Sequence, residues 1–258
     1  MWLSTIATLL LLVVNASAFA ADALVSGSTA RVAEIVDGDT LVMEDGRQVR
    51  LVGIQAPKLP LGRSHVKEQP VAAEAKTALE SLALGRTLRL SYGGRRVDRY
   101  DWQLAHLHDE SGRWIQGDLL LQGLARVYSF RNNRTLVKDM LTLEREARIA
   151  RRGIWGHPFY RIRTVTEAEK HLDSFQLIEG RVLDAADVRG WIYLNFGDDW
   201  RSDFTITICP KDRRRFRDVT PDLLSLQGRH VRVRGWIHRR NGPMIDVTHP
   251  EQIELLNE

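Results

Sequence analysis

Polar and apolar residues alternate along residues 30–54, which read ARVAEIVDGDTLVMEDGRQVRLVGI. An Asp-Gly pair interrupts the alternation twice, at positions 37–38 and again at positions 45–46. Alternation is typical of half-buried strands, and Asp-Gly between two alternating runs is a strong signal for a hairpin turn. The pattern therefore predicts three short strands connected by two tight turns.

The spacing of apolar residues changes to a helical period in residues 71–84, VAAEAKTALESLAL, and Gly85 follows in the position of a C-terminal cap. Two strand patterns, TLRLSY and QLAHLH, come next, and helical patterns return in WIQGDLLLQG and in TLVKDMLTLEREARIARRG. This order predicts a β-rich α+β fold for residues 30–156, in which helices pack on a small β-barrel.

A second domain is predicted for residues 174–258, after a connection at residues 157–173. Its strand patterns are FQLIEGRVLDA, GWIYLNF, DFTITI, HVRVRGWIH and MIDV, with a short helix at residues 221–226. Three strands, a helix and two strands are compatible with a small OB-like β-barrel. A five-stranded sandwich of another topology is the alternative that this pattern leaves open.

The first residues, MWLSTIATLLLLVVNASAFA, contain an apolar run followed by small residues in an A-x-A arrangement. This pattern predicts a signal peptide at residues 1–20 and export to the periplasm or the extracellular space. The run is shorter than the ~20 apolar residues of a membrane helix, so no stable membrane span is expected after signal removal. The lone cysteine, Cys209, allows no internal disulfide and no zinc finger.

Basic residues are gathered in four segments of a chain whose formal net charge is +4 at pH 7. The segments are GGRRVDRYDW, EREARIARRG, KDRRRFRD and RHVRVRGWIHRR. Such clusters attract nucleic acid or another polyanion, because binding releases the counterions around the phosphates. A solvated basic face without a partner is the alternative, since net charge governs non-specific binding and not fold. The sequence gives no signal for the oligomeric state.

Five motifs stand in one order along residues 30–155: VDGDT, VRLVGIQAPK, VDRYDWQLAHL, QGLARVYSF and EREARIARRGIW. Together they resemble the thermonuclease, or staphylococcal nuclease-like, family. The resemblance implies an OB-type β-barrel with three helices that cuts single- or double-stranded nucleic acid with Ca²⁺. In the family mechanism two aspartates and a backbone carbonyl hold the metal, a glutamate is the general base, and two arginines bind the phosphate.

The resemblance assigns roles to positions that this chain keeps. Asp39, the second acid of DGDT, matches the first metal ligand, and Asp37 matches a supporting acid beside it. Arg50 matches the first phosphate-binding arginine, which makes it a candidate for both catalysis and substrate binding. Tyr100 matches a position beside the bound nucleotide.

The chain departs from the family at three positions that carry the chemistry. Gln55 stands at the second metal-binding aspartate, Lys58 at the general base and Trp102 at the second arginine. Asp39, the Gln55 amide and the Ala56 backbone carbonyl are left as a weak Ca²⁺ site. An ammonium at about 4 Å from the metal makes metal binding less favourable by a few kcal/mol at an effective dielectric of about 20. This repulsion is avoided if the flexible lysine side chain points outward.

The same substitutions favour a phosphate in the absence of metal, because the pocket beside Arg50 loses two carboxylates and gains the cation of Lys58. Tyr100 and Trp102 offer faces on which unpaired bases stack, at ~1–3 kcal/mol per base. Packing of Trp102 against the barrel is its alternative role. Losing a general base typically costs ~10²–10⁴ in rate, so cleavage is expected to suffer.

Three functions follow from these residues. The first is an exported, nuclease-like protein that binds nucleic acid and has a degenerate active site with weak or absent Ca²⁺-dependent cleavage. The second is an active metal-dependent endonuclease with a rearranged site, whose general base is sought among Glu68, Glu74 and Asp101. The third is a cell-envelope module for protein interaction, whose basic charge serves solubility or attachment to acidic surfaces.

Overall fold

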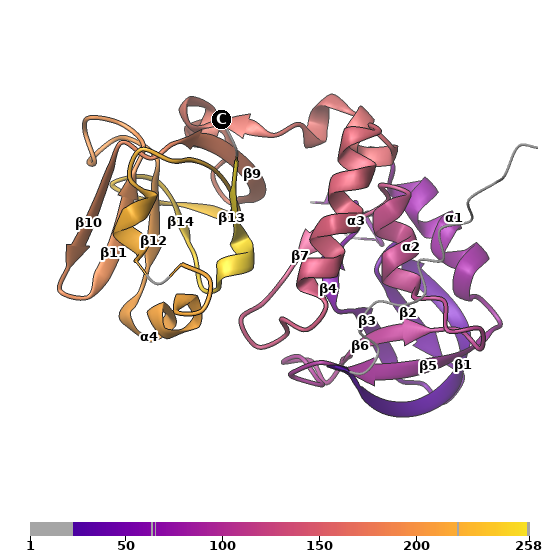
Figure 1. Cartoon of the computed structure of the whole chain (residues 1–258). Coiled ribbons are helices and arrows are strands. Elements are labelled where there is room, and N and C mark those ends of the chain that lie inside the picture. The colour runs from indigo at the N-terminus through magenta and orange to yellow at the C-terminus, as the bar shows by residue number, and fades with distance from the viewer. Residues whose placement is uncertain (1–22, 63, 65, 221, 257–258) are drawn as a thin grey trace, which may run out of the picture.

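The structure, a computed structural model, describes residues 23–62, 64, 66–220 and 222–256. The signal peptide predicted at residues 1–20 lies outside these residues. Figure 1 shows two β-rich halves, of which the N-terminal one carries the longer helices. No helix in the described part of the chain is long and apolar enough to cross a bilayer.

The N-terminal half contains the strands β1 (Val25–Asp37), β2 (Thr40–Met43), β3 (Gln48–Leu51), β5 (Thr87–Tyr92) and β6 (Gln103–His108). They close into a barrel in the order β1-β2-β3-β6-β5. The two predicted hairpins are confirmed, because β1 pairs antiparallel with β2, and β2 with β3. The barrel closes through a parallel pairing of β3 with β6 and antiparallel pairings of β5 with β6 and β1.

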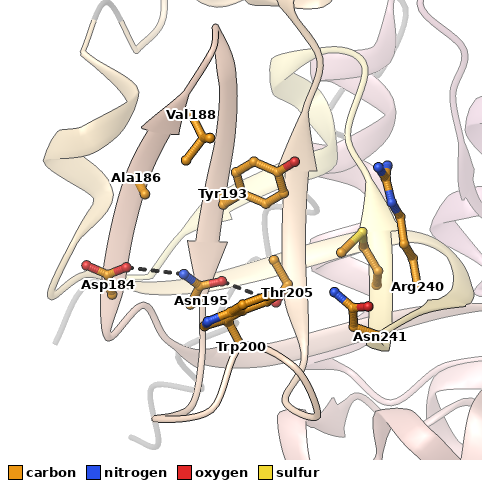
Figure 2. Close-up of a pocket in the computed structure, with 10 residues that line it drawn as sticks. Asp184, Ala186, Val188, Tyr193, Asn195, Trp200, Thr205, Arg240 and Asn241 are labelled. Carbon is orange, nitrogen blue, oxygen red and sulfur yellow. Dashed lines mark hydrogen bonds between the residues drawn. The ribbon is translucent and has the colours of Figure 1, made fainter.

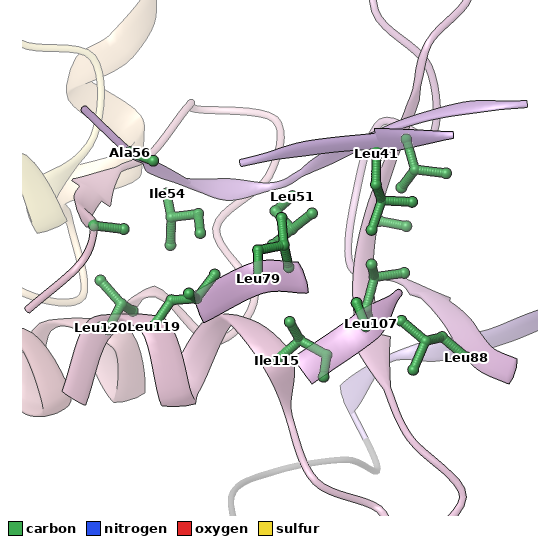
Figure 3. Packing of buried hydrophobic residues seen from close by; sticks show 14 of the residues in the cluster. Leu41, Leu51, Ile54, Ala56, Leu79, Leu88, Leu107, Ile115, Leu119 and Leu120 are labelled. Atoms are coloured by element: carbon green, nitrogen blue, oxygen red, sulfur yellow. The ribbon is translucent and has the colours of Figure 1, made fainter. Parts of the chain in front are cut away.

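The helices that pack on this barrel are α1 (Ala72–Ala83), α2 (Ile115–Leu121) and α3 (Val137–Ile149). Gly85 follows α1 with a φ of 68°, the left-handed conformation expected of a helix-ending glycine. Leu79 of α1, Ile115 of α2 and Leu51 of the barrel belong to one buried core (Figure 3). The closed barrel and its packed helices confirm the predicted OB-type, staphylococcal nuclease-like fold class.

A short antiparallel pair, β4 (Gly53–Gln55) with β7 (Arg126–Tyr128), stands apart from the barrel and was not predicted. Gly53 has a φ of 87°, and a Cβ there would lie 2.6 Å from the Met140 side chain. Glycine is therefore required where the chain turns from β3 into β4. The pairing places Gln55 opposite Arg126.

The C-terminal half is a single sheet in the order β10-β11-β12-β14-β13-β9-β8, with β15 paired to β13. Its strands are β8 (Arg163–Thr164), β9 (Ser174–Arg181), β10 (Asp184–Val188), β11 (Trp191–Asn195), β12 (Thr205–Ile208), β13 (His230–Arg240), β14 (Gly242–Asp246) and β15 (Ile253–Leu255). The predicted strand at 175–185 is divided between β9 and β10, and β8 and β15 are additional. The OB-like topology of this half stays a prediction.

Short helices precede or connect the strands of the C-terminal half. They are α4 (Pro210–Arg213) and the 3₁₀ helices η3 (Gly153–Gly156), η4 (Pro158–Tyr160), η5 (Val165–His171), η6 (Arg214–Phe216), η7 (Leu223–Leu226) and η8 (Pro250–Gln252). The segment 157–173, predicted as a connection, contains β8, which pairs parallel with β9. Part of this connection therefore belongs to the second sheet.

A buried ion-pair network joins the two halves. Arg234 of β13 is only 1% exposed, and its guanidinium donates to Glu144 of α3 at 2.8 and 3.0 Å and to Glu254 of β15 at 2.6 Å. Arg148 of α3 also contacts Glu254 at 3.1 Å. Burial acts to raise the pKa of Glu254, but Arg234, Arg148 and Arg232 outweigh it and lower the pKa to about 2. The network holds the two halves in one arrangement.

This network corrects the interpretation of two basic segments. Arg148 in EREARIARRG, and Arg232 and Arg234 in RHVRVRGWIHRR, have mostly buried side chains that pair with glutamates. These cations are neutralised inside the protein and are not available to a polyanion. The segment GGRRVDRYDW, by contrast, keeps Arg95 and Arg96 exposed.

Candidate nucleic-acid site

A pocket of about 560 Å³ lies where the turn between β1 and β2 meets the loop between β5 and β6. We call it the barrel pocket. It is lined by Val36, Asp37, Thr40, Arg50, Lys58, Leu61, Asp98, Tyr100 and Trp102. Most residues that the sequence assigned to a site therefore line one cavity.

Asp39 is completely buried at the β1–β2 turn. Its carboxylate accepts hydrogen bonds from the Ala56 backbone N–H at 2.8 Å and from the Thr40 hydroxyl at 3.1 Å. Its own N–H donates to Asp37 Oδ1 at 3.0 Å. Gly38 leaves no space for a side chain, since a Cβ there would lie 2.7 Å from the Cβ of Ala56. The tight turn keeps the two carboxylates close together.

Lys58 supplies the cation for both carboxylates. Its Nζ lies 3.1 and 3.0 Å from the two oxygens of Asp39 and 3.7 Å from Asp37 Oδ2, so the side chain points inward. Burial acts to raise the pKa of Asp39, but the charges of Lys58 and Arg50 outweigh it and hold that pKa below its usual value. Burial and the neighbouring Asp39 raise the pKa of Asp37.

Calcium does not fit this arrangement of residues. Ca²⁺ takes about six to eight oxygen ligands, whereas both Asp39 oxygens already accept hydrogen bonds from the Lys58 ammonium. An ammonium in this position repels a divalent cation. Across the described ranges, no group of three or more His, Cys, Asp or Glu side chains is placed to hold a metal ion.

Gln55, predicted as a weak metal ligand, uses its amide oxygen elsewhere. Gln55 Oε1 accepts two hydrogen bonds from the Arg126 guanidinium, at 2.8 and 3.1 Å. That guanidinium also lies 4.6 Å from the ring centroid of Phe175 in the C-terminal half. The neutral amide at position 55 therefore binds a half-buried arginine that the sequence analysis missed, and no local pattern connected these two positions.

Arg50 is the cation of the barrel pocket that remains available to a ligand. It lies on β3 between Thr40 of β2 and Leu104 of β6, and its side chain lines the cavity. Among the described residues, no hydrogen bond or ion pair engages its guanidinium. A partly buried, unpaired guanidinium in a cavity is suited to bidentate contact with a phosphate.

Tyr100 and Trp102 form the other wall of the pocket. Asp98 Oδ1 accepts hydrogen bonds from both of their backbone N–H groups, at 2.7 and 3.1 Å, and Asp101 between them has a φ of 63°. The two rings are tilted by 49° with centroids 6.3 Å apart. Tyr100 is 62% exposed and Trp102 is half-buried, so both rings keep surface for a ligand.

The carboxylates sought as a replacement general base do not line this pocket. Glu68, Glu74 and Asp101 are exposed side chains outside its lining. The acids that do line it are engaged: Asp37 contacts Lys58, and Asp98 caps its own loop. The arrangement offers cations and aromatic faces to a ligand, and none of the described residues places a free carboxylate beside Arg50.

Comparison with known proteins places this fold in a family. The family model for staphylococcal nuclease homologues matches residues 48–157. An "Uncharacterized endonuclease" of Escherichia coli O157:H7 is 30% identical over 129 residues, which cover 49% of this chain and 76% of that protein. The chain belongs to the staphylococcal nuclease homologue family. "Protein ParB" of Escherichia coli is 31% identical over 138 residues, covering 49% of this chain and 72% of that protein.

The family match divides the site residues of this staphylococcal nuclease homologue. Arg50, Gln55, Lys58 and Trp102 lie within the matched segment, whereas the DGDT turn precedes its first residue, 48. The β-rich segment after residue 157 lies outside the match. The family match therefore covers β3, β5 and β6 of the barrel and part of its pocket, and leaves the C-terminal sheet to be interpreted from its own residues.

Replacing Lys58 with methionine is expected to lower the free energy of unfolding at neutral pH by about 3 kcal/mol, because the buried carboxylate of Asp39 loses the cation that is hydrogen-bonded to it. Without the ammonium the pKa of Asp39 rises, so the deficit relative to the natural chain shrinks as acid protonates the carboxylate. Urea unfolding at neutral and acidic pH measures both effects.

The matched control is Lys138→Met, since Lys138 is exposed on α3 and its side chain has no acidic partner in the described structure. It is expected to change the free energy of unfolding by less than about 0.5 kcal/mol. A Lys58→Met deficit that is the same at both pH values would contradict the pairing with Asp39.

Proposed function

We propose that this protein is an exported nuclease homologue that binds nucleic acid through the barrel pocket without Ca²⁺, and that it cleaves phosphodiester bonds weakly or not at all. The observation that carries the proposal is the Lys58 ammonium bound to Asp39, with Arg50 unpaired beside it. Export through residues 1–20 rests on the signal pattern, which cell fractionation tests.

Binding follows from the charges and rings of the pocket. A phosphate of the ligand is held by Arg50, which is free of internal partners among the described residues. Lys58 adds a second positive charge at the same wall, although the aspartates beside it neutralise part of that charge. An unpaired base stacks on Tyr100 or Trp102, whose exposed ring surfaces face the ligand space.

Weak cleavage follows from the same residues. The position that carries the general base in the family is here Lys58, a cation already bound to two carboxylates. Loss of a general base typically costs ~10²–10⁴ in rate. The position of the second phosphate-binding arginine is Trp102, and removing such an electrostatic stabiliser can cost a further ~10²–10³.

Arg50→Ala is expected to weaken binding of single-stranded DNA and RNA in the presence of a chelator by about tenfold or more, since a charge-assisted hydrogen bond contributes ~1.5–3 kcal/mol. Fluorescence anisotropy at several salt concentrations measures this loss. The natural chain should show affinity that falls with salt, as expected for phosphate binding. The matched control is Arg145→Ala, an exposed arginine of α3 outside the pocket.

Incubation with the same nucleic acids, with Ca²⁺ or with other divalent ions, decides between this proposal and its alternative. The alternative, a working endonuclease with a rearranged site, is favoured by the names of the Escherichia coli relatives. Fast metal-dependent cutting that Arg50→Ala abolishes would establish the alternative. Affinity that does not change with salt would contradict a polyanionic ligand.

A further inference from the structure

An open hollow of about 440 Å³ lies on the C-terminal sheet, on the face turned away from that domain's apolar core. Figure 2 shows Tyr193 of β11 on its floor and Trp200 lying across one end. Val188 of β10 and Arg240 at the end of β13 stand on opposite sides. Trp200 is 52% exposed, and Val188 is also 52% exposed, so this face has an apolar surface with no partner in the described structure.

Polar groups line the same hollow next to Trp200. Asn195 donates from its amide to Asp184 at 3.2 Å and accepts from the Thr205 hydroxyl at 3.3 Å (Figure 2). Asp184 is exposed. Its carboxylate lies in the same hollow as the Trp200 ring and can accept a hydrogen bond from the amino group of a base. An aromatic face with an adjacent hydrogen-bonding group is suited to a planar, polar-edged ring.

A second hollow, of about 420 Å³, continues along this face toward the N-terminal half. Trp191 of β11, two residues before Tyr193, lines it together with Lys211 of α4 and Arg131. The guanidinium of Arg240 lies 5.8 Å from the ring centroid of Trp191, which connects the two hollows. Arg131 comes from the loop between β7 and α3, so a residue of the N-terminal half lines a cavity of the C-terminal sheet.

That loop also contacts the loop that carries the aromatic wall of the barrel pocket. Asn133 donates from its side chain to the Arg95 carbonyl at 2.8 Å, and the Arg95 N–H donates to the Asn132 carbonyl at 3.1 Å. Arg95 belongs to the segment between β5 and β6 that ends in Tyr100 and Trp102. A chain of touching segments therefore leads from the barrel pocket to the open sheet face.

Unneutralised cations follow this path. These cations are Arg95, Arg96, Arg99, Lys211 and Arg240. All five side chains are exposed, and none has an acidic partner within the described ranges. Among the acids near the sheet face, Asp187 pairs with Arg213 at 2.7 Å and Asp212 with Arg131 at 3.3 Å, whereas the exposed Asp184 has no cationic partner among the described residues. The path offers alternating positive charges and aromatic rings, the combination that binds single-stranded nucleic acid.

We propose that one single strand of nucleic acid runs from the barrel pocket over the two touching loops to the C-terminal sheet, where unpaired bases stack on Tyr193 and Trp200 beside Arg240. The inference rests on the proposed function for the end of the strand at Arg50, and adds a second binding site that names the ligand as single-stranded. A duplex keeps its bases stacked inside and cannot offer them to the rings of the sheet face.

Charge and geometry favour this ligand over an acidic peptide. An acidic peptide would form ion pairs with the cations. It has no planar ring at every residue to stack on Tyr193, Trp191 and Trp200. Continuity with the pocket of a nuclease-family domain also favours nucleic acid, because the same ligand satisfies both ends of the path. An acidic polypeptide is retained as an outcome of the test.

The test compares oligothymidylates of about 5 and about 20 nucleotides, lengths that bracket the ~4–16 nucleotides covered by a small single-strand-binding domain. Fluorescence anisotropy with a chelator measures how much affinity the longer strand gains over the shorter one. The variant Trp200→Ala with Arg240→Ala is expected to remove about tenfold or more of that gain. The matched control changes an exposed aromatic and an exposed arginine off the path, Phe159→Ala with Arg145→Ala.

The outcomes separate this inference from the proposed function. If the Trp200 and Arg240 variant keeps the full gain while Arg50→Ala weakens both strands, the second site is wrong and the barrel pocket stands. If Arg50→Ala has no effect while the gain is lost, the barrel-pocket proposal is wrong and the sheet-face site stands. Equal affinity for a duplex of the longer length, or equally effective competition by polyglutamate, would overturn the assignment of a single strand.

Discussion

A chain that carries Gln55→Asp, Lys58→Glu and Trp102→Arg together is expected to cut single-stranded DNA with Ca²⁺ at least about 100-fold faster than the natural chain, since general-base catalysis contributes ~10²–10⁴. The three changes introduce the charges that the resemblance assigns to these positions, in a pocket that Arg50 lines and beside the buried Asp39. A single-turnover cleavage assay with and without chelator measures the rate.

The physical reason lies in the ammonium at the DGDT turn. Removing Lys58 takes its ammonium away from both oxygens of Asp39, and a carboxylate at position 58 adds negative charge beside Asp37. Without metal these acids repel one another, so the variant should be less stable than the natural chain. Ca²⁺ relieves that repulsion and stabilises the folded state by mass action. A rise in melting temperature on adding Ca²⁺, absent in the natural chain, is a readout independent of cleavage.

The matched control for this experiment is a variant that keeps the contact between Gln55 and Arg126. In the natural chain its guanidinium holds the Gln55 amide, and a carboxylate at position 55 would attract it more strongly. The double variant Lys58→Glu with Trp102→Arg leaves that contact intact. Faster cleavage by the triple variant than by the double variant means that the new carboxylate reaches the metal. Equal rates mean that Arg126 retains it, and no gain in either variant would contradict the proposal that these three residues weaken cleavage.

Replacing Arg234 with alanine is expected to lower the free energy of unfolding by about 3–5 kcal/mol, because one partner of a buried charge network is removed. Glu144 is completely buried and Glu254 nearly so, and each loses a charge-assisted hydrogen bond to this arginine. Since the network joins α3 to the C-terminal sheet, the two halves should also separate more easily. Urea unfolding followed by far-UV circular dichroism measures the stability.

The control for this prediction lies on the same strand. Arg239 of β13 is 58% exposed and pairs with an exposed glutamate, Glu169, so Arg239→Ala should cost less than about 1 kcal/mol. Limited proteolysis of residues 157–173 reports whether the halves have separated. An Arg234→Ala protein as stable as Arg239→Ala would contradict the structural role assigned to the network.

The sequence predicted the elements of the N-terminal half well, because their signals are local. Alternation and Asp-Gly pairs located β1 to β3, and the helical period located α1 to within two residues of each end. Residues of β1, β2 and β3 meet because short turns connect them, so their pairing follows from neighbouring positions. The separate pair of β4 with β7 was missed, since its two strands are short and distant in sequence.

The sequence also determined which chemical groups the candidate site contains: Arg50 is present, and Gln55, Lys58 and Trp102 stand where the resemblance predicts an aspartate, a general base and a second arginine. The tertiary structure alone decided what those groups do. Lys58 meets Asp39 across 19 positions, Gln55 meets Arg126 across 71, and Arg234 meets Glu144 across 90. Such contacts carry no local periodicity, because they depend on the folding of whole strands and domains against one another. For that reason the sequence left the direction of Lys58 open, and only the fold placed its ammonium on Asp39.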